Sequence, residues 1–226
     1  MSDSASDIAS RRAAILSQAA RAAQEAGRKA DDVTLVAVSK RQPDARIDAA
    51  LKAGQRVFGE NRVQEAQAHW AVRRADYPDL ELRLIGSLQS NKAADAAELF
   101  DVIETLDRDS LAKALRKAFD AGSPVPRLYV QVNTGAEDQK SGVAVAETQA
   151  FVDRMRHEFG FEIEGLMCIP PVGEPAGPHF ALLAGLAQAA GVEKLSMGMS
   201  ADFETAIRFG ATSIRVGSAL FGAREA

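Results

Sequence analysis

Short apolar segments alternate with helical segments along the whole chain. Residues 33–39 (VTLVAVS) are apolar and rich in β-branched side chains, which predicts a strand, and the spacing of apolar residues after Pro43 predicts a helix. The alternation recurs, and the predicted strands cover residues 33–39, 56–60, 82–86, 101–106, 127–133, 162–169, 194–198 and 212–217. An alanine-rich segment before the first strand predicts a leading helix at about residues 8–26.

This order of elements predicts an α/β fold. Near-continuous apolar strands separated by helices are typical of a parallel sheet that is covered on both faces. Eight such units in 226 residues predict a closed (β/α)8 barrel, a TIM barrel, as a single domain over residues 1–226. An open doubly wound sheet is the alternative. Such a sheet usually carries GxGxxG after its first strand, and here residues 39–44 read SKRQPD.

Composition excludes several classes of function. The net charge of -4 disfavours nucleic-acid binding, which uses a basic surface. No apolar run approaches the ~18 residues of a membrane helix and no signal core leads the chain, so we expect a cytoplasmic protein with no membrane partner. Cys168 is the only cysteine and the three histidines are far apart, so we expect no metal site. A closed barrel leaves no free strand edge, which favours a monomer.

Two loops of the predicted barrel are suited to phosphate. Barrel active sites lie at the carboxyl ends of the strands, and phosphate is often bound by the loops after strands seven and eight. Each loop carries one glycine and one serine, Gly198 and Ser200 in the first and Gly217 and Ser218 in the second. The alternative is that the serines are helix N-caps and the glycines turn residues. Asp202 and Glu204 would repel an anion, so a phosphate site requires them to point outward.

Lys40 is the candidate nucleophile. It ends the first apolar strand, where partial desolvation would lower its pKa toward the amine that forms Schiff bases. The alternative is a lysine that extends to solvent from the barrel rim. Lys92, Lys140 and Lys194 are weaker candidates because they lie in loops, in an early helix turn or at the start of a strand.

Arg215 precedes Gly217 by two residues and should lie deeper than a bound anion. Its guanidinium stays charged in proteins. The alternative role is a structural ion pair, for example with Glu60. Cys168 is most simply a small buried residue, because no histidine lies near it in sequence.

Several segments resemble one known family. They are VAVSK (36–40), FGENRVQEA (58–66), IGSLQSNK (85–92), QVNTG with KSG (131–142), GLMCIP (165–170), LSMGMSADFETAI (195–207) and IRVGSALFGAR (214–224). In this order they are similar to the pyridoxal phosphate homeostasis protein family, with the older names YggS and PROSC. The barrel of that family resembles the N-terminal domain of alanine racemase, fold type III of the pyridoxal-phosphate proteins.

The resemblance implies a role for each candidate residue. Lys40 would form the internal aldimine with pyridoxal 5'-phosphate, and Arg215 would face the pyridine nitrogen. The phosphate would be held by Ser200, Gly217 and Ser218, with backbone near Met197 and Met199. Asn61 would lie near the ring; its alternative role is the N-cap of a helix, with Gln64 completing a capping box.

The sequence departs from the family pattern at three places. Ser87 stands where many members have histidine, and Gln42 lies near a position that often holds lysine or a similar residue. Pro178 and His179 precede Phe180, where an arginine is often found. These departures leave the predicted cofactor site intact.

Arg215 favours a carrier over an enzyme. Pyridoxal phosphate catalysis uses a protonated pyridinium as electron sink, and a permanent cation at the nitrogen disfavours that proton. A racemase also needs two bases, and Tyr77 and Tyr129 are the only phenols, of which Tyr77 precedes a strand at the opposite rim. The family implies a non-enzymatic role in vitamin B6 homeostasis and delivery to apo-enzymes. The alternatives are a low-activity amino-acid racemase and a phosphosugar isomerase or aldolase with Lys40 as Schiff-base lysine.

Overall fold

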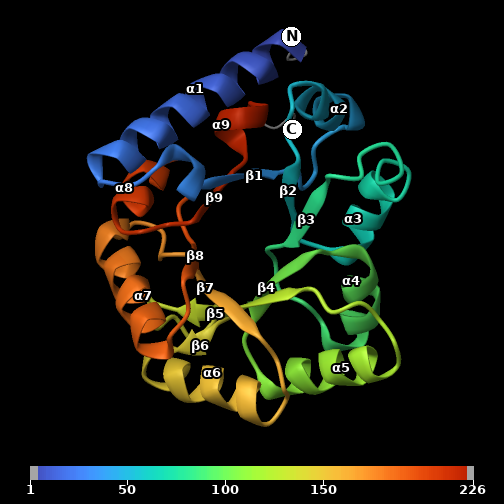
Figure 1. The fold of residues 1–226 in the computed structure, drawn as a ribbon, viewed down its shortest axis with the longest axis vertical. Coiled ribbons are helices and arrows are strands. Elements are labelled where there is room, and N and C mark those ends of the chain that lie inside the picture. The colour runs from blue at the N-terminus through green and yellow to red at the C-terminus, as the bar shows by residue number, and fades with distance from the viewer. Residues whose placement is uncertain (1–4, 223–226) are drawn as a thin grey trace.

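The computed structural model describes residues 5–222, which form a closed barrel of parallel strands surrounded by helices (Figure 1). The strand order is β4-β3-β2-β1-β9-β8-β7-β5, and a further pairing of β4 with β5 closes the ring. A short strand, β6, pairs with β5 outside this ring. The predicted (β/α)8 barrel is confirmed, and the open doubly wound sheet is excluded because a closed ring has no edges.

The strands fall where the apolar segments predicted them. Their bounds are β1 Thr34–Val38, β2 Val57–Glu60, β3 Glu81–Leu84, β4 Val102–Leu106, β5 Arg127–Asn133, β6 Val143–Ala144, β7 Ile163–Cys168, β8 Lys194–Ser196 and β9 Ser213–Val216. Every strand expected from the sequence overlaps one of them. The pattern missed β6, because two residues are too few to show any periodicity.

The helices follow the strands on the outside of the ring. Their bounds are α1 Ala5–Glu25, α2 Asp44–Lys52, α3 Val63–Trp70, α4 Ala93–Leu99, α5 Asp109–Asp120, α6 Thr148–His157, α7 Ala176–Ala190, α8 Phe203–Arg208 and α9 Ser218–Phe221. Short 3-10 turns cover Ala30–Asp32, Ser90–Lys92 and Val145–Glu147. No helix within residues 5–222 is long and apolar enough to cross a membrane.

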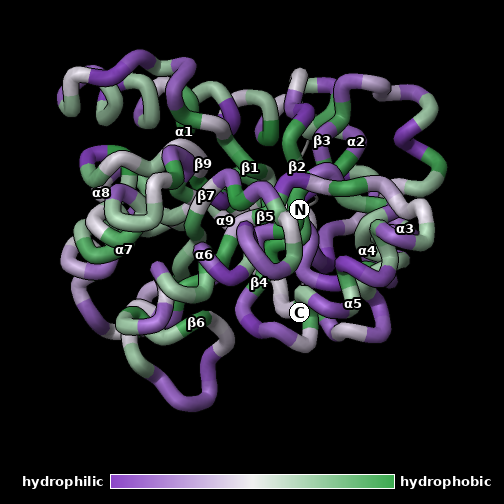
Figure 2. Tube along the Cα trace, turned by 60° about the horizontal axis from the view of Figure 1, so that its bottom comes forward, coloured by the Kyte–Doolittle hydropathy of each residue, from purple (hydrophilic) through white to green (hydrophobic). Residues whose placement is uncertain are grey.

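The main apolar core lies between the strands and the helices. Strand side chains alternate between the two faces, and Leu35 and Ala37 of β1 belong to this outer core. The rings of Phe58 on β2 and Trp70 on α3 pack with their centroids 4.6 Å apart. Figure 2 shows the hydrophobic strands at the centre of the molecule and a hydrophilic loop that projects beside β6. The helices are therefore held by burial of one apolar face each.

The first and last strands of the barrel pair with each other. In the register of β1 and β9, Val36 lies opposite Arg215 and Ala37 opposite Val216. On its other edge β1 pairs with β2, where Val38 lies opposite Gly59. Helix α1 packs against α2, α8 and α9, so the two ends of the described chain meet on one side (Figure 1). Strands β2, β1, β9 and β8 are consequently neighbours.

Two glycines give a matched test of this packing. An added Cβ at Gly165 on β7 would lie 2.3 Å from the carbonyl oxygen of Lys194 and 2.7 Å from Cε1 of Tyr129, whereas at the exposed Gly185 on α7 no heavy atom lies within 4 Å. We expect Gly165→Ala to lower the free energy of unfolding by about 1–3 kcal/mol or more. Gly185→Ala should raise it by about 0.5–1 kcal/mol, because glycine is unfavourable inside a helix.

Denaturant unfolding of the two variants measures both changes. The same loss of stability in both would contradict this packing, because only Gly165 faces the backbone of a neighbouring strand.

Candidate functional site

Four neighbouring strands bring the predicted site residues to one end of the barrel. Lys40 follows β1, Asn61 follows β2, Met197, Met199 and Ser200 follow β8, and Arg215, Gly217 and Ser218 lie on or directly after β9. All four strands are parallel, so these positions lie at the same carboxyl-terminal rim. The strand order β2-β1-β9-β8 places Lys40 between Asn61 on one side and Arg215 on the other.

The two predicted phosphate loops are in contact. The Oγ atoms of Ser200 and Ser218 lie 3.4 Å apart, and the backbone N–H of Ala219 donates to Ser200 Oγ at 3.4 Å. Ser218 is exposed and Ser200 is half-buried. Two hydroxyl groups therefore face each other at an open rim of the barrel.

The two glycines of these loops differ in their structural role. Gly198 has a φ of +92°, and an added Cβ would lie 2.5 Å from the Cβ of Ala206 on α8, so the local fold requires glycine there. At Gly217 an added Cβ would meet only Val38 atoms, at 3.5 Å or more, which is ordinary contact. Packing explains Gly198 as a turn residue. It does not explain Gly217, whose bare backbone leaves room for close approach by a ligand.

The backbone N–H groups of Met197 and Met199 already have partners. Met197 donates to the carbonyl of Ser213 at 3.2 Å, and its side chain is fully buried in the apolar core. Met199 donates to Oδ1 of Asp202 at 2.6 Å. The carboxylate of Asp202 therefore folds back to close the turn before α8.

Glu204 behaves as expected of an outward residue. It lies one turn from Arg208 on α8, with the charged atoms 3.9 Å apart. Arg208 in turn pairs with Glu25 at the end of α1 at 2.8 Å. Glu204 thus belongs to the surface between α8 and α1.

Arg215 is buried inside the barrel, with 4% of its surface exposed. Its Nη1 donates to Ser196 Oγ at 2.7 Å and its Nη2 donates to the carbonyl of Cys168 at 2.8 Å. Nε has no hydrogen bond within the described residues. The suggested ion pair with Glu60 is wrong, because β8 and β7 supply nearer partners than β2.

Glu60 instead organises the end of β2. Its fully buried carboxylate accepts hydrogen bonds at Oε1 from Ser39 Oγ at 2.7 Å and from Trp70 Nε1 at 3.1 Å, and His69 Nδ1 lies 3.0 Å away. Its Oε2 is buried and has no partner in the part of the chain that the structure describes. Ser39 directly precedes Lys40, so this cluster fixes the backbone from which Lys40 projects.

The same cluster predicts a pH dependence of stability. The hydrogen bond from His69 to Glu60 raises the pKa of His69, opposed by burial, while Asp44 raises it further and Arg73 lowers it. A raised folded-state pKa means that the charged histidine stabilises the fold. This contribution is complete below the pKa of ~6.5 in the unfolded chain and is lost as pH rises through the folded-state pKa.

We therefore expect the stability difference between wild type and His69→Gln to be larger at pH 6 than at pH 8. Urea unfolding of both proteins at the two pH values measures it. A difference that is the same at both pH values, or larger at pH 8, would contradict the pairing of His69 with Glu60.

Asn61 does not cap a helix. Helix α3 begins at Val63, and its N-cap is Arg62, which makes no side-chain capping hydrogen bond. The capping box with Gln64 is wrong, because the chain needs two residues to leave β2 before it can turn into the helix. Asn61 instead lines a cavity of about 310 Å³ at the barrel mouth, together with Gln131, Asn133 and Ile169.

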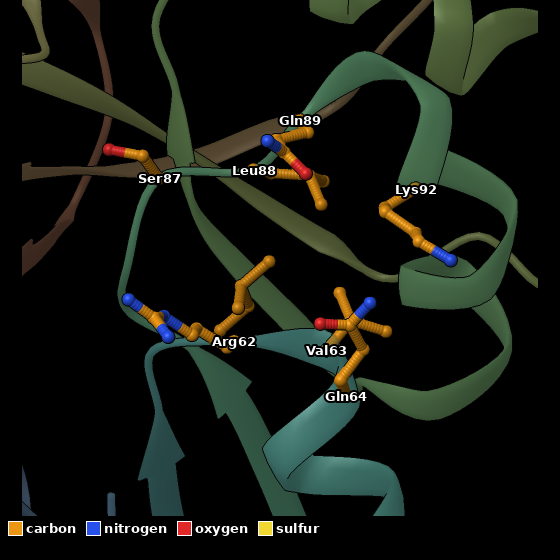
Figure 3. Close-up of a pocket in the computed structure, with 8 residues that line it drawn as sticks. Arg62, Val63, Gln64, Ser87, Leu88, Gln89 and Lys92 are labelled. Atoms are coloured by element: carbon orange, nitrogen blue, oxygen red, sulfur yellow. The ribbon is translucent and has the colours of Figure 1, made fainter.

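Two of the family departures lie near this rim. Ser87 lines the same cavity, and its Oγ lies 2.8 Å from Ser141 Oγ. Gln42 is buried and accepts a hydrogen bond from Arg46 at 3.3 Å. A second cavity of about 420 Å³ lies outside the barrel mouth, between Arg62 and Gln64 at the start of α3 and the segment before α4 (Figure 3). It contains none of the predicted site residues.

The third departure lies ahead of Phe180 on α7. His179, which precedes it, is buried, with Nδ1 3.2 Å from the carbonyl oxygen of Thr134 and Nε2 3.2 Å from Glu174. The histidine therefore joins α7 to the segment after β5.

The thiol of Cys168 is not activated. Burial raises its pKa to about 12, although the positive charge of Arg215 lowers it, so the thiol stays protonated at neutral pH. Its side chain belongs to the apolar core. The interpretation of Cys168 as a small buried residue therefore fits the structure.

Both phenols lie at the opposite end of the barrel. Tyr129 on β5 lines a floor cavity of about 310 Å³ together with Glu81, Lys194 and Ser213, which begin their strands. Burial raises the pKa of Tyr129. Tyr77 precedes β3, with the guanidinium of Arg56 5.0 Å from its ring centroid. Neither hydroxyl lies at the rim that carries Lys40.

Within residues 5–222 there is no group of three or more histidine, cysteine, aspartate or glutamate side chains that could hold a metal ion. Among the predicted site residues, the rim offers the amine of Lys40, the guanidinium of Arg215, the hydroxyls of Ser200 and Ser218 and the side-chain amide of Asn61.

Comparison with known proteins identifies the family. The sequence profile of "Alanine racemase, N-terminal domain" matches residues 12–225. A pyridoxal phosphate homeostasis protein of Pseudomonas aeruginosa is 42% identical over 225 residues, which cover 97% of each chain. One of Escherichia coli (strain K12) is 37% identical over 230 residues, again with 97% of each chain covered.

Solved structures agree with this match. PipY of Synechococcus elongatus PCC7942 with PLP bound is 40% identical, with a TM-score of 0.81 over 95% of this chain and 100% of that chain. An alanine racemase of Corynebacterium glutamicum is 19% identical, with a TM-score of 0.65 over 93% of this chain and 61% of that chain, and so shares the fold alone. The profile and the curated relatives span nearly the full chain, and the chain therefore belongs to the pyridoxal phosphate homeostasis protein family, with a barrel like the N-terminal domain of alanine racemase.

Proposed function

We propose that this protein binds pyridoxal 5'-phosphate reversibly through Lys40 and acts in vitamin B6 homeostasis, holding the cofactor and delivering it to apo-enzymes. The observation that carries the proposal is the placement of Lys40, Arg215 and the Ser200–Ser218 pair at the ends of the adjacent strands β1, β9 and β8. The homeostasis proteins at 37–42% identity and PipY with PLP bound support it.

The residues at the rim fit the chemistry of this cofactor. Pyridoxal phosphate supplies an aldehyde, an electron-withdrawing ring and a phosphate when it is bound. Lys40 offers the amine that takes up the aldehyde, and the hydroxyls of Ser200 and Ser218 with the bare backbone of Gly217 offer a phosphate site. The Nε–H group of Arg215 offers a hydrogen-bond donor to the pyridine nitrogen. That nitrogen can accept the bond when it carries no proton.

The phosphate site in this proposal differs from the one expected from sequence. The N–H groups of Met197 and Met199 serve Ser213 and Asp202, so these residues shape the loop and the serine hydroxyls bind. Asn61 lies across the rim from them and would contact the ring side of the cofactor, where its side chain lines the mouth cavity.

Two features favour a carrier over a racemase. A permanent cation at Arg215 disfavours protonation of the pyridine nitrogen, which weakens the electron sink that α-carbon chemistry needs. Racemisation also requires a base on each face of the substrate, and both tyrosines lie at the barrel floor. We therefore propose a protein without catalytic turnover.

One experiment tests binding and turnover together. Purified protein is titrated with pyridoxal phosphate and followed by visible absorption, and the loaded protein is then incubated with amino acids in heavy water. We expect a saturable protein-bound band and no cofactor-dependent exchange of the α-proton. Sustained exchange of the α-proton would contradict this proposal and favour an amino-acid racemase. Absence of binding, together with turnover of phosphorylated sugars, would replace it with the isomerase or aldolase.

We also propose that the protein is a cytoplasmic monomer and one domain. The closed ring of strands supports the monomer and the single domain, because β1 and β9 pair with each other and leave no open edge in the ring. Light scattering after size exclusion tests the monomer, which a mass of two or more chains would contradict.

A further inference from the structure

Four polar side chains form a buried hydrogen-bonded chain across the barrel interior. Arg215 Nη1 donates to Ser196 Oγ at 2.7 Å, and Ser196 Oγ donates to Glu104 Oε2 at 2.5 Å. Arg83 Nη1 donates to Glu104 Oε1 at 3.1 Å. These residues, here called the interior network, lie on β9, β8, β4 and β3, so the network runs from the candidate site to the opposite wall.

All four residues of the interior network are buried. Ser196 and Glu104 have no exposed surface, and Arg83 and Arg215 are 5% and 4% exposed. A buried carboxylate is tolerated only when it is paired and hydrogen-bonded. Glu104 meets this condition through two different groups, a guanidinium at one oxygen and a hydroxyl at the other.

The network has a defined direction at Ser196. A hydroxyl has one proton, and the carboxylate of Glu104 only accepts, so that proton is committed to Glu104. The lone pairs of Ser196 Oγ are then turned to Arg215, which only donates. The two acceptors Ser196 Oγ and Cys168 O together fix the plane of the Arg215 guanidinium.

Glu104 is the carboxylate that is linked to Arg215, through the hydroxyl of Ser196. Arg83 has further partners, Glu81 at 2.6 Å and Ser213 Oγ at 3.3 Å. Ser196, in contrast, joins Arg215 to Glu104 and to no other carboxylate in the described residues. The negative charge of Glu104 is therefore connected to Arg215 through one hydroxyl group, that of Ser196.

From this geometry we infer that Ser196 and Glu104 are positioning residues for the cofactor. Neither touches the cofactor; they hold Arg215 so that its Nε meets the pyridine nitrogen and keeps that nitrogen unprotonated. The inference rests on the proposed function. Without Ser196 the guanidinium keeps only the carbonyl of Cys168, turns away from the nitrogen, and lets the nitrogen take a proton from water.

A matched pair of serine variants tests the inference. Ser196→Ala removes the link to Arg215, whereas Ser213→Ala removes an equally buried hydroxyl that accepts from Arg83. Each variant is loaded with pyridoxal phosphate labelled with ¹⁵N in the ring, and the ¹⁵N chemical shift and the Kd are measured. We expect Ser196→Ala to move the shift toward the protonated form and to weaken binding about tenfold, the worth of one hydrogen bond to a charged group.

We expect Ser213→Ala to keep the wild-type shift and a Kd within twofold of it, and Ser196→Thr, which retains the hydroxyl, to recover the wild-type shift. Thermal unfolding of the cofactor-free variants reports any general loss of packing. A wild-type shift and Kd in Ser196→Ala would overturn the inference, as would the same change in both alanine variants. Failure of the wild type to bind pyridoxal phosphate would instead overturn the proposed function.

Discussion

Replacing Lys40 with alanine should abolish covalent attachment of pyridoxal phosphate. Lys40 leaves β1 at the rim where β9 supplies Arg215 and the two serine loops meet, and an alanine there offers no amine to the aldehyde. Wild type treated with pyridoxal phosphate and borohydride should gain the mass of one reduced adduct. Lys40→Ala should gain none, and its visible absorption band should disappear.

Lys194→Ala is the matched control for this prediction. Lys194 begins β8 and lines the floor cavity at the other end of the barrel, so its loss should leave the adduct at the wild-type level. An adduct that persists in Lys40→Ala would assign the covalent site to another lysine, and peptide mapping would show which one.

Glu104→Ala should cause the largest loss of stability among single changes in the barrel interior. It leaves the guanidinium of Arg83 and the hydroxyl of Ser196 without the carboxylate that both contact, and that carboxylate has no exposed surface. Breaking a buried charge pair by removing one partner typically costs about 3–5 kcal/mol. Urea unfolding of the cofactor-free protein at neutral pH measures the change in the free energy of unfolding.

Glu81→Ala provides the comparison. Glu81 also forms an ion pair with Arg83, but 24% of its side chain is exposed. It forms a second ion pair with Arg127, whose side chain is 44% exposed. We expect a loss of about 1–2 kcal/mol, because water replaces part of the lost interaction. Equal losses in the two variants would show that burial of Glu104 does not set its contribution.

The barrel could be predicted from sequence because its strands are buried on both faces. Segments such as 33–39 (VTLVAVS) are rich in apolar and β-branched residues along their whole length, and this property marks a parallel strand without any knowledge of its neighbours. The residues at strand ends followed directly, since parallel strands end at a common rim. The short β6 escaped prediction because its pairing with β5 is a tertiary event.

Hydrogen-bond partners could not be predicted in the same way. Arg215 bonds to Ser196 in place of Glu60, because closure of the barrel sets which side chains of different strands meet. The hydrogen bond from Met199 to Asp202 depends on the shape of the loop after β8. One signal was present and unused: Glu104 is a charged residue inside the apolar strand VIETL (102–106). A buried charge in such a strand requires a partner, and that requirement points to the interior network.

The pairing of β1 with β9 brings together two parts of the candidate site that are far apart in the sequence. Lys40 follows the first strand and Arg215 lies on the last, so almost the whole chain must leave the ribosome before the two residues can meet. A nascent chain that has made only β1 to β8 exposes Lys40 without the strand that carries Arg215. Under the proposed function, a chain that has not yet added β9 would lack the Arg215 side of the cofactor site.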